Sequence, residues 1–327
     1  RILTFDVTLD TDCTLCATAA VELNTADTVT VYLAEEGASP TAWVKMGPDT
    51  RMNIPILQLH AETTYTVHIE VDTLQSETRA FQTGALPEEL PPITLSASNE
   101  GHTPTGLTVF PVGEWRGGEP SDVNYLLAID ADGAIVWYRR FDGMTLGLHV
   151  DDHNRIYTTD SAQTLVRIDP YGQTSTQWNT TDFGLDTAHH EVRDAPSEGM
   201  TFLSTEMRAI DGWFDESTGE TRSYNIIGDR YITLDAEGAI TWSWSLMDHL
   251  DPLTHYTADM HNPFWQQLAP YDAFDTVKDW SHGNALVPYE DGWLGSFRNL
   301  DWLIQVHEET GDIDWVLGPD GDFELAE

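Results

Sequence analysis

The sequence has little positive charge. Its 327 residues include 15 Lys and Arg against 55 Asp and Glu, which gives a formal net charge of −40 at pH 7. Such a chain repels nucleic-acid phosphates and anionic lipid surfaces, so we expect neither as a partner. An anionic substrate would need an arginine or histidine placed beside it, which makes the few basic residues informative. The sequence also lacks any run of eighteen apolar residues, so we expect no membrane-spanning helix.

Cysteine is nearly absent. Cys13 and Cys16 are the only two, spaced C-x-x-C. No βαβ pattern surrounds them, as a redox pair would require, and no second pair exists to complete a zinc site. We predict a local disulfide, which is typical of an exported protein. The sequence begins at Arg1 with neither a methionine nor a signal peptide, as expected of a processed or partial chain. We therefore expect a periplasmic, cell-surface or secreted location.

The first ninety residues alternate apolar and polar side chains in short runs. Examples are ILTFDVTL, TVTVYLAE and TYTVHIEV. Such runs with turn residues between them predict a β-sandwich over residues 1–90. Leu59 and Tyr65 stand six apart, and this spacing resembles the tyrosine corner of fibronectin type III domains. A Pro-rich segment at residues 86–92 follows, and we place a domain boundary there.

Residues 93–327 contain four copies of a hairpin pattern, apolar–x–apolar–D–x–x–G. The pattern's glycines are Gly133, Gly172, Gly238 and Gly311, and the last copy has His307 in place of the aspartate. In three copies a tryptophan follows the glycine by four residues, where it would pack between neighbouring sheets. Hairpins that recur at multiples of about forty residues predict a β-propeller with about four blades present. The alternative is an ordinary run of hairpins in a sandwich.

A histidine recurs at the start of two similar stretches. HHEVRDAPSEGMTFLSTE aligns without a gap with SHGNALVPYEDGWLGSFR, so that His190 falls on His282 and Glu206 on Arg298. Repeated units that aim the same position at one axis would bring the two imidazoles together. A histidine beside a permanently charged, planar guanidinium can bind and process one anion. We therefore predict a catalytic site made of His190, His282 and Arg298.

Other candidates lie in or near the insertions between hairpins. We predict substrate contacts from His189, Asn284, Trp213 and Tyr256, with Phe214 and Trp265 as further partners for ring stacking; each aromatic residue has packing between blades as an alternative role. Three histidines at even spacing could instead bind a metal ion: His249, His255 and His261. D-x-D-G runs such as residues 130–133 could suggest calcium, but the rest of a calcium loop is missing and a turn explains them. We expect no metal and no cofactor.

The two histidine motifs and the segment TGDIDWVLG resemble the bacterial arylsulfotransferase family over most of residues 93–320. The resemblance implies a six-bladed propeller after a small β-sandwich, and an aryl sulfate rather than a nucleotide as sulfate donor. It implies that Arg298 holds the sulfate and that His282 and His190 act beside it. The family's nucleophilic histidine lies after the position of Leu317 and Gly318. No histidine follows there before Glu327, so the propeller looks truncated at its C-terminal end.

The leading functional hypothesis is an aryl-sulfate sulfotransferase. It would transfer a sulfuryl group from a phenolic sulfate ester to a phenol through a sulfohistidine intermediate. The alternative is a non-catalytic extracellular propeller that binds or assembles with another protein. Phenolic sulfates and phenols are the expected small-molecule partners, and a homo-oligomer or an assembly partner fits either hypothesis.

Overall fold

A computed structural model describes residues 1–96, 106–116, 119–143, 145–215, 218–255, 265–268, 270–275 and 277–323. The chain divides into two compact units, Arg1–Asp142 and Gly143–Glu327. The predicted all-β class is confirmed, because the helices in the described part are 3-10 turns of three or four residues. None of these helices has the length and apolar character needed to cross a membrane. The expected boundary at residues 86–92 stays a prediction.

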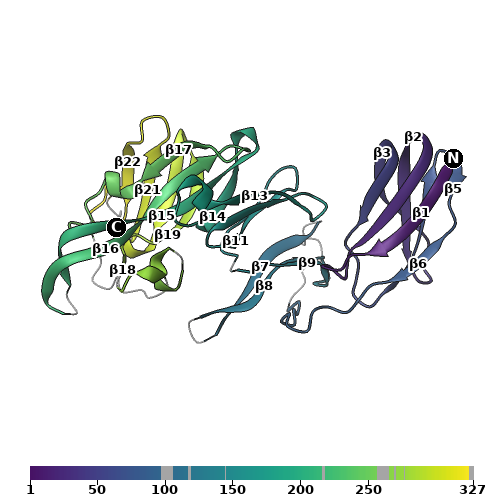
Figure 1. Ribbon diagram of the computed structural model, residues 1–327, viewed down its shortest axis with the longest axis horizontal. Helices are drawn as coiled ribbons and strands as arrows, with labels where there is room; N and C mark the ends of the chain where they lie inside the picture. The colour runs from purple at the N-terminus through teal and green to yellow at the C-terminus, as the bar shows by residue number, and fades with distance from the viewer. Residues whose placement is uncertain are drawn as a thin grey trace. The chain divides into compact units, whose positions relative to one another are not determined.

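The first unit opens with a curled six-stranded sheet (Figure 1). The long strand β2 pairs with β3 along one edge, and with β1 and then β4 along the other. Alternate side chains of these strands point inward, and Val31, Ile54 and Val67 are fully buried in the resulting core. The strands are β1 (Ile2–Leu9), β2 (Ala17–Glu35), β3 (Thr41–Ile56), β4 (Thr64–Val71), β5 (Leu74–Gln75) and β6 (Arg79–Gln82).

Two local contacts fix loops of this sheet. The hydroxyl of Tyr65 accepts a hydrogen bond from the backbone N–H of His60 at 2.9 Å, and Leu59 beside it is fully buried. This is the contact that a tyrosine corner makes, with the ring in the core and the hydroxyl on the backbone. Cys13 and Cys16 form the predicted disulfide. The fibronectin-type identity of the sheet remains a prediction.

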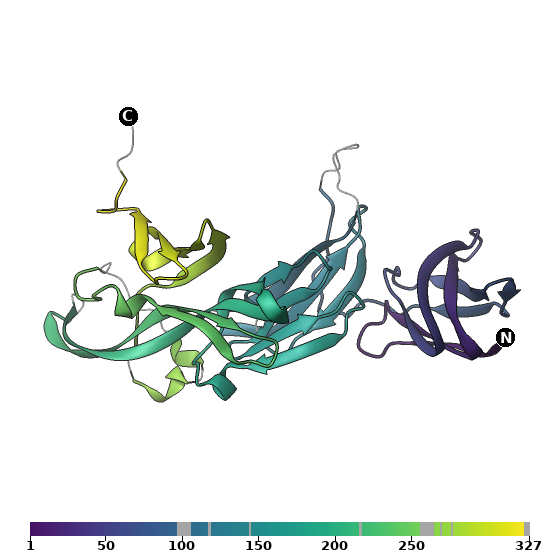
Figure 2. The same ribbon diagram turned by 90° about the horizontal axis from the view of Figure 1, so that it is seen from above.

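The rest of the described chain forms antiparallel sheets in which consecutive strands are neighbours (Figures 1 and 2). A three-stranded sheet, β7–β9, ends the first unit. The second unit contains two four-stranded sheets, β10–β13 and β19–β22, and a five-stranded sheet made of β14–β17 and one added strand. Four antiparallel strands in sequence order are the form of a propeller blade. The strands are β7 (Thr108–Arg116), β8 (Glu119–Ile129), β9 (Ile135–Arg140), β10 (Leu148–Val150), β11 (Ile156–Ser161), β12 (Thr164–Ile168), β13 (Thr174–Asn179), β14 (His189–Ala195), β15 (Gly199–Asp215), β16 (Glu220–Leu234), β17 (Ile240–Ser245), β19 (Gly283–Tyr289), β20 (Gly292–Phe297), β21 (Trp302–His307) and β22 (Ile313–Leu317).

The segment between β17 and β19 adds a strand to the β14–β17 sheet. Strand β18 (Val277–Asp279) pairs in parallel with β16, with Val277 opposite Asn225 and Asp279 opposite Ile227. β15 and β16 are much longer than β14 and β17 and run on as a ribbon (Figure 2). The 3-10 helices are η1 (Thr180–Phe183), η2 (Pro196–Glu198), η3 (Leu246–Asp248), η4 (Trp265–Gln267), η5 (Tyr271–Ala273) and η6 (Arg298–Leu300).

The four repeated turns have the predicted conformation. Gly133, Gly172, Gly238 and Gly311 all have positive φ, between 74° and 88°, which glycine adopts without strain. In three of the turns the aspartate carboxylate accepts hydrogen bonds from backbone N–H groups of its own turn, as Asp130 does from Asp132 and Ala134. Turn formation thus accounts for these aspartates.

Tryptophans join the β14–β17 sheet to the β19–β22 sheet. The indole N–H of Trp242 donates to the Glu308 carbonyl at 3.0 Å, and that of Trp244 donates to the Gly311 carbonyl at 2.8 Å. Trp242 also stacks on Trp293 with ring centroids 6.2 Å apart. Trp242 is one of the tryptophans that follow a repeat glycine, so this one takes the inter-sheet place that the pattern predicts.

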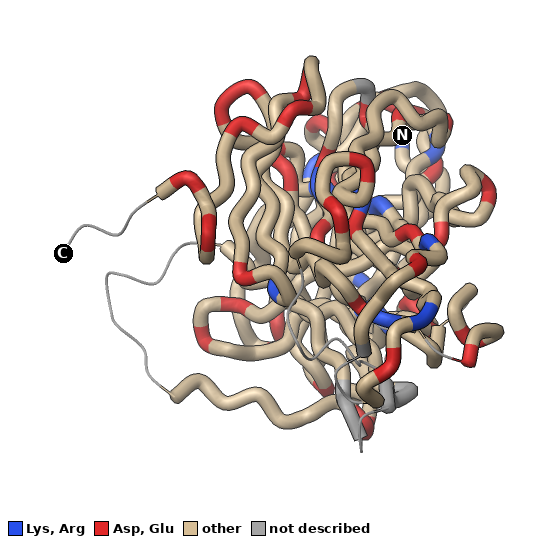
Figure 3. Tube along the Cα trace, turned by 90° about the vertical axis from the view of Figure 1, so that its left-hand side faces the viewer, with Lys and Arg blue, Asp and Glu red and all other residues tan. Residues whose placement is uncertain are grey.

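Acidic residues lie along most of the chain, whereas lysines and arginines are sparse (Figure 3). Several arginines are held by carboxylates, for example Arg155 by Asp151 at 2.6 Å and Arg208 by Asp248 at 2.8 Å.

Gly295 allows β20 to approach β16 closely. A Cβ added at Gly295 would overlap the hydroxyl of Tyr231 and lie 2.8 Å from its Cζ. Tyr231 is fully buried, and its hydroxyl has no hydrogen-bond partner among the described residues. We expect Gly295→Ala to lower the free energy of unfolding by about 1–3 kcal/mol, measured by urea unfolding, because the core is overpacked.

The control for Gly295→Ala is Tyr231→Phe, which removes the overlapping oxygen. In that background the alanine should destabilise the protein less than it does alone. An equal loss in both backgrounds would show that the overlap does not limit this position.

Candidate functional site

The two repeated histidines lie side by side. His190 belongs to β14, and His282 directly precedes β19; both are first strands of their sheets. The strands are neighbours, since Nε of Arg193 on β14 donates to the Leu286 carbonyl of β19 at 2.8 Å. The ring centroids of His190 and His282 are 5.4 Å apart with an interplanar angle of 52°. Two separate sheets thus deliver one imidazole each to a single place.

Both histidines have an uncommon backbone conformation. φ is 52° at His190 and 51° at His282, in the left-handed region. Glu198 and Glu290, which the sequence alignment also pairs, share it with φ of 58° and 50°. Few residues other than glycine adopt this region, and such positions gather at functional sites. The two stretches therefore share an unusual backbone conformation, as well as the residue type, at these two positions.

The ungapped alignment does not continue past the turn. The alignment places Ala195 on Val287, yet Ala195 pairs with Gly199 at the end of its hairpin. Val287 pairs with Leu294, and its hairpin stays paired as far as Tyr289 and Gly292. The predicted equivalence of Glu206 and Arg298 therefore does not hold in the strand pairing. Glu206 lies within β15 and forms an ion pair with Arg208 at 3.0 Å.

Arg298 lies next to His282. It begins η6 directly after β20, and its backbone N–H donates to the His282 carbonyl at 3.1 Å. Its Nη2 is 3.3 Å from Nδ1 of His282, and its Nε donates to the Asn299 side-chain oxygen at 3.2 Å. The side chain is exposed. A guanidinium in this position offers donors to an anion that arrives from solvent.

A buried carboxylate lies behind each of the two histidine motifs. Asp279, which ends β18, approaches Nδ1 of His282 at 2.5 Å. Asp229 of β16 accepts hydrogen bonds from the Ser281 hydroxyl at 2.5 Å and the Gly283 N–H at 2.7 Å. Nε2 of His189 lies 3.0 Å from the other oxygen of Asp229, close enough for a charge interaction although the hydrogen-bond angle is poor.

Asp229 stays ionised in this setting. Burial alone would raise the pKa of its carboxyl group, but the contacts with His189, Ser281 and Gly283 outweigh burial and leave the pKa below its ordinary value. The carboxylate thus ties the segment before β19 to the β14 motif. Asp229 is 1% exposed, so this contact lies beneath the histidine motifs and away from solvent.

Trp265 covers the histidines from η4. Its ring makes edge contacts with His189, at 5.3 Å between centroids, and with His282, at 6.3 Å. It is 1% exposed, so in this structure its ring packs on imidazoles and on Tyr271. His189 is equally buried, whereas His190 is only partly so. The alignment matched His190, rather than His189, with His282, and the ring of His190 is the one that lies beside the ring of His282.

The remaining predicted residues lie elsewhere or outside the described chain. Asn284 is at the bulge between Gly283 and Ala285, two residues after His282. Trp213 is buried in a hydrophobic cluster with Tyr224 and Ile226, whereas Phe214 is 48% exposed. Tyr256 and His261 lie outside the described residues. The substrate-binding roles of these side chains stay predictions.

The other two loop histidines have separate surroundings. His249 stacks on Trp244 with centroids 4.9 Å apart, and His255 packs beside Trp302 at 5.2 Å. Over the described ranges, no group of three or more His, Cys, Asp or Glu side chains is arranged to hold a metal ion.

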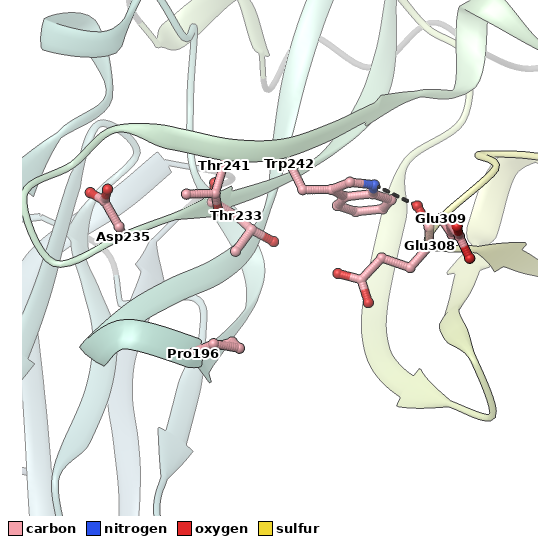
Figure 4. A pocket seen from close by; sticks show the side chains of 7 residues that line it. All are labelled: Pro196, Thr233, Asp235, Thr241, Trp242, Glu308 and Glu309. Atoms are coloured by element: carbon pink, nitrogen blue, oxygen red, sulfur yellow. Dashed lines mark hydrogen bonds between the residues drawn. The ribbon is translucent and has the colours of Figure 1, made fainter.

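A pocket elsewhere in the second unit does not suit a sulfate ester. It is lined by Pro196, Thr233, Asp235, Thr241, Trp242, Glu308 and Glu309 (Figure 4). Three of these side chains are carboxylates, which repel an anion, and none belongs to the histidine cluster. The cluster with Arg298 is the better anion site.

His190 is held neutral. Burial, followed by the neighbouring His189 and His282, lowers its pKa to about 4. Because the folded pKa lies below the ordinary value of 6.5, the unfolded state binds more protons between these values, and stability rises with pH there. We expect this residue to contribute a slope of about 1.4 kcal/mol per pH unit in that window.

Urea unfolding between pH 4 and pH 6.5 measures that slope, with His190→Asn as the comparison because asparagine tolerates positive φ. The variant should lose the contribution of His190 to the slope. The groups that face His190 are His189, His282, Asp229 and Arg298, and they remain in both proteins. Parallel curves would show that His190 is not held neutral.

Asp229 and Asp279 were missed in the sequence. Asp229 has a signal, since Asp229 and Arg230 interrupt the mostly apolar strand YNIIGDRYITL with charged residues. Asp279 precedes His282 by three residues, but nothing local shows that its carboxylate turns back to the imidazole. That contact depends on the parallel pairing of β18 with β16.

Comparison with known proteins places this arrangement in a family. A family model described as Arylsulfotransferase (ASST) matches residues 101–326, whereas no curated protein sequence matches the chain. Among solved structures, the crystal structure of BamB from Moraxella catarrhalis is similar at 12% identity and a TM-score of 0.35. That alignment covers 79% of this chain and 60% of BamB, so the chain spans less than two thirds of BamB. Because the family match extends over more than half of the sequence, the protein belongs to the arylsulfotransferase family.

Proposed function

We propose that the protein transfers a sulfuryl group from a phenolic sulfate ester to a phenol. The observation that carries the proposal is the convergence of His190, His282 and the exposed Arg298, in a chain of the arylsulfotransferase family. We also propose the finer features that the resemblance implies: a six-bladed propeller after a fibronectin-like domain, an exported location, and a donor that is not a nucleotide.

The chemistry asks for few groups. Sulfuryl transfer resembles phosphoryl transfer, in which negative charge spreads over three equatorial oxygens while the nucleophile and the leaving group lie in line. The guanidinium of Arg298 would neutralise those oxygens. A phenolate leaves well because the pKa of a phenol is about 10.

The proposed reaction has two half-reactions. In the first, the bond between sulfur and the aryl oxygen breaks, and a bond forms between sulfur and an imidazole nitrogen of the nucleophilic histidine that the resemblance places after Leu317 and Gly318. The departing phenolate takes a proton from another histidine. In the second, the sulfur–nitrogen bond breaks as the acceptor phenol bonds to sulfur and gives its proton back. His282 and His190 would exchange these protons as general acid and general base.

The test uses the intact protein with 4-nitrophenyl sulfate and a second phenol. We expect 4-nitrophenolate release that depends on the acceptor, with formation of the acceptor's sulfate ester detected by mass spectrometry. Without an acceptor, the protein should gain the mass of one SO3 group on a histidine. If the intact protein releases no more 4-nitrophenolate than buffer does, the proposal is wrong, and a non-catalytic propeller becomes the better explanation.

A further inference from the structure

Asp279 lies directly behind His282. Its carboxylate Oδ2 is 2.5 Å from Nδ1 of the imidazole. Asp279 is 1% exposed and His282 is 6% exposed, so water competes little for this contact. A carboxylate that accepts from a ring N–H forms a charge-assisted hydrogen bond, which is shorter and stronger than a bond between neutral groups.

The same ring nitrogen has a second neighbour, Nη2 of Arg298 at 3.3 Å. A guanidinium only donates hydrogen bonds and a carboxylate only accepts them, so Nδ1 cannot be satisfied by both at once. The shorter contact, with Asp279, decides in favour of a proton on Nδ1. A neutral imidazole has one N–H, and therefore Nε2 carries the lone pair.

The backbone holds Asp279 in place. Asp279 pairs with Ile227 in the parallel ladder between β18 and β16, and the N–H of Trp280 donates to the Ile227 carbonyl at 3.0 Å. The carbonyl of Asp279 accepts a hydrogen bond from the side chain of Asn299 at 2.7 Å. The backbone of Asp279 is thus fixed from two directions, by the sheet and by η6, and a fixed backbone limits where its carboxylate can lie.

The first repeat lacks this carboxylate. The alignment of His190 with His282 places Thr187 where the second motif has Asp279. The hydroxyl of Thr187 forms a hydrogen bond with the Thr205 hydroxyl at 2.5 Å and carries no charge. The two imidazoles therefore differ in their support, which would give them different tasks in a reaction.

We propose that Asp279 is a positioning residue that keeps the proton of His282 on Nδ1 and so presents Nε2 as the proton-accepting atom. This role rests on the proposed function. As the acceptor oxygen bonds to sulfur, its proton moves to Nε2, and the carboxylate of Asp279 stabilises the imidazolium that forms. The imidazolium then returns the proton to the next departing phenolate, which completes the cycle.

The first experiment measures the tautomer itself. Nitrogen-15 spectra of the protein with ring-labelled histidine report which ring nitrogen carries hydrogen, and His282→Gln identifies the signal of His282. We expect Nδ1–H in the wild type and a change toward the other tautomer in Asp279→Ala. Nε2–H in the wild type, or the same tautomer in both proteins, would overturn the proposal.

The second experiment separates positioning from general structural support. Asp279→Asn should lower kcat at least about a hundredfold with little change in KM for 4-nitrophenyl sulfate. The acid limb of the pH–rate profile of Asp279→Asn should move about one pH unit lower, because the substitution removes the carboxylate charge that stabilises the imidazolium in the wild type. Arg298, His190 and Trp265 also face His282 and are unchanged by this substitution. The control Asp275→Asn alters an exposed carboxylate four residues earlier and should behave as the wild type.

An unchanged kcat in folded Asp279→Asn would overturn the positioning role. The two proposals fail in different ways. A wild-type protein without aryl-sulfate transfer would refute the proposed function, whereas the tautomer of His282 would still be measured and would decide whether Asp279 fixes it.

Discussion

Replacing Arg298 with alanine is expected to lower kcat/KM for 4-nitrophenyl sulfate about a hundred- to a thousandfold. The guanidinium lies 3.3 Å from His282 and is exposed, so it can reach a sulfate beside the imidazole. Its donors would meet charge that is spread over the transferring oxygens, which makes the loss largest in the transition state. Steady-state kinetics of 4-nitrophenolate release measure the effect.

Two further variants sharpen that prediction. Arg298→Lys keeps the charge but not the planar fork, so its activity should fall between those of the wild type and the alanine variant. Arg222→Ala removes an arginine of the β15–β16 ribbon that pairs with Glu220 at 3.2 Å, and it should leave turnover unchanged. Turnover by Arg298→Ala equal to that of Arg222→Ala would contradict the anion-binding role.

The second large effect concerns folding. Asp229→Ala is expected to lower the free energy of unfolding by about 3–5 kcal/mol, because a buried carboxylate that holds several donors is lost. The N–H of Gly283 and the hydroxyl of Ser281 would lose their acceptor, and His189 would lose the charge beside it. Urea unfolding followed by tryptophan fluorescence measures the change.

Asp229→Asn is the informative comparison. Its amide oxygen still accepts hydrogen bonds, so its free energy of unfolding should fall less than that of Asp229→Ala. Asp314→Ala, at an exposed position of β22, should stay within about 0.5 kcal/mol of the wild type. The folded pKa of Asp229 is lowered, so its contribution is present above the unfolded value and is lost as the pH falls through the folded one. A loss in Asp229→Ala no larger than in Asp314→Ala would contradict this account.

The sequence predicted the local features well because short-range rules govern them. Gly133 and its three counterparts required positive φ, and alternating side chains predicted the strands. The proximity of His190 and His282 followed from the repeat, since equivalent positions of neighbouring sheets meet. The register after each turn was not predictable, because the hairpin after His282 stays paired as far as Tyr289, whereas the hairpin after His190 stays paired only as far as Ala195.

The carboxylates of the site depend on longer-range geometry. Asp279 reaches His282 because an insertion of the chain returns to pair β18 with β16, and Asp229 lies 54 residues before Gly283, to which it is bonded. Neither contact has a periodic signature. Trp213 was predicted as a substrate contact because it is an aromatic residue near an insertion. The sequence did not indicate that the fold buries it at 4% exposure, and its role stays a prediction.

The left-handed backbone at positions 190 and 282 limits how the site can vary. Any replacement there faces two independent demands, one from the main-chain angle and one from the chemistry. Asparagine and glycine would satisfy the angle without supplying an imidazole, whereas valine or isoleucine would fail both, because a branched Cβ disfavours this conformation. Variants from saturation mutagenesis at either position should therefore fall into two groups, one that folds but has no activity and one that is poorly expressed. Protein abundance would report on the backbone angle, and turnover would report on the imidazole.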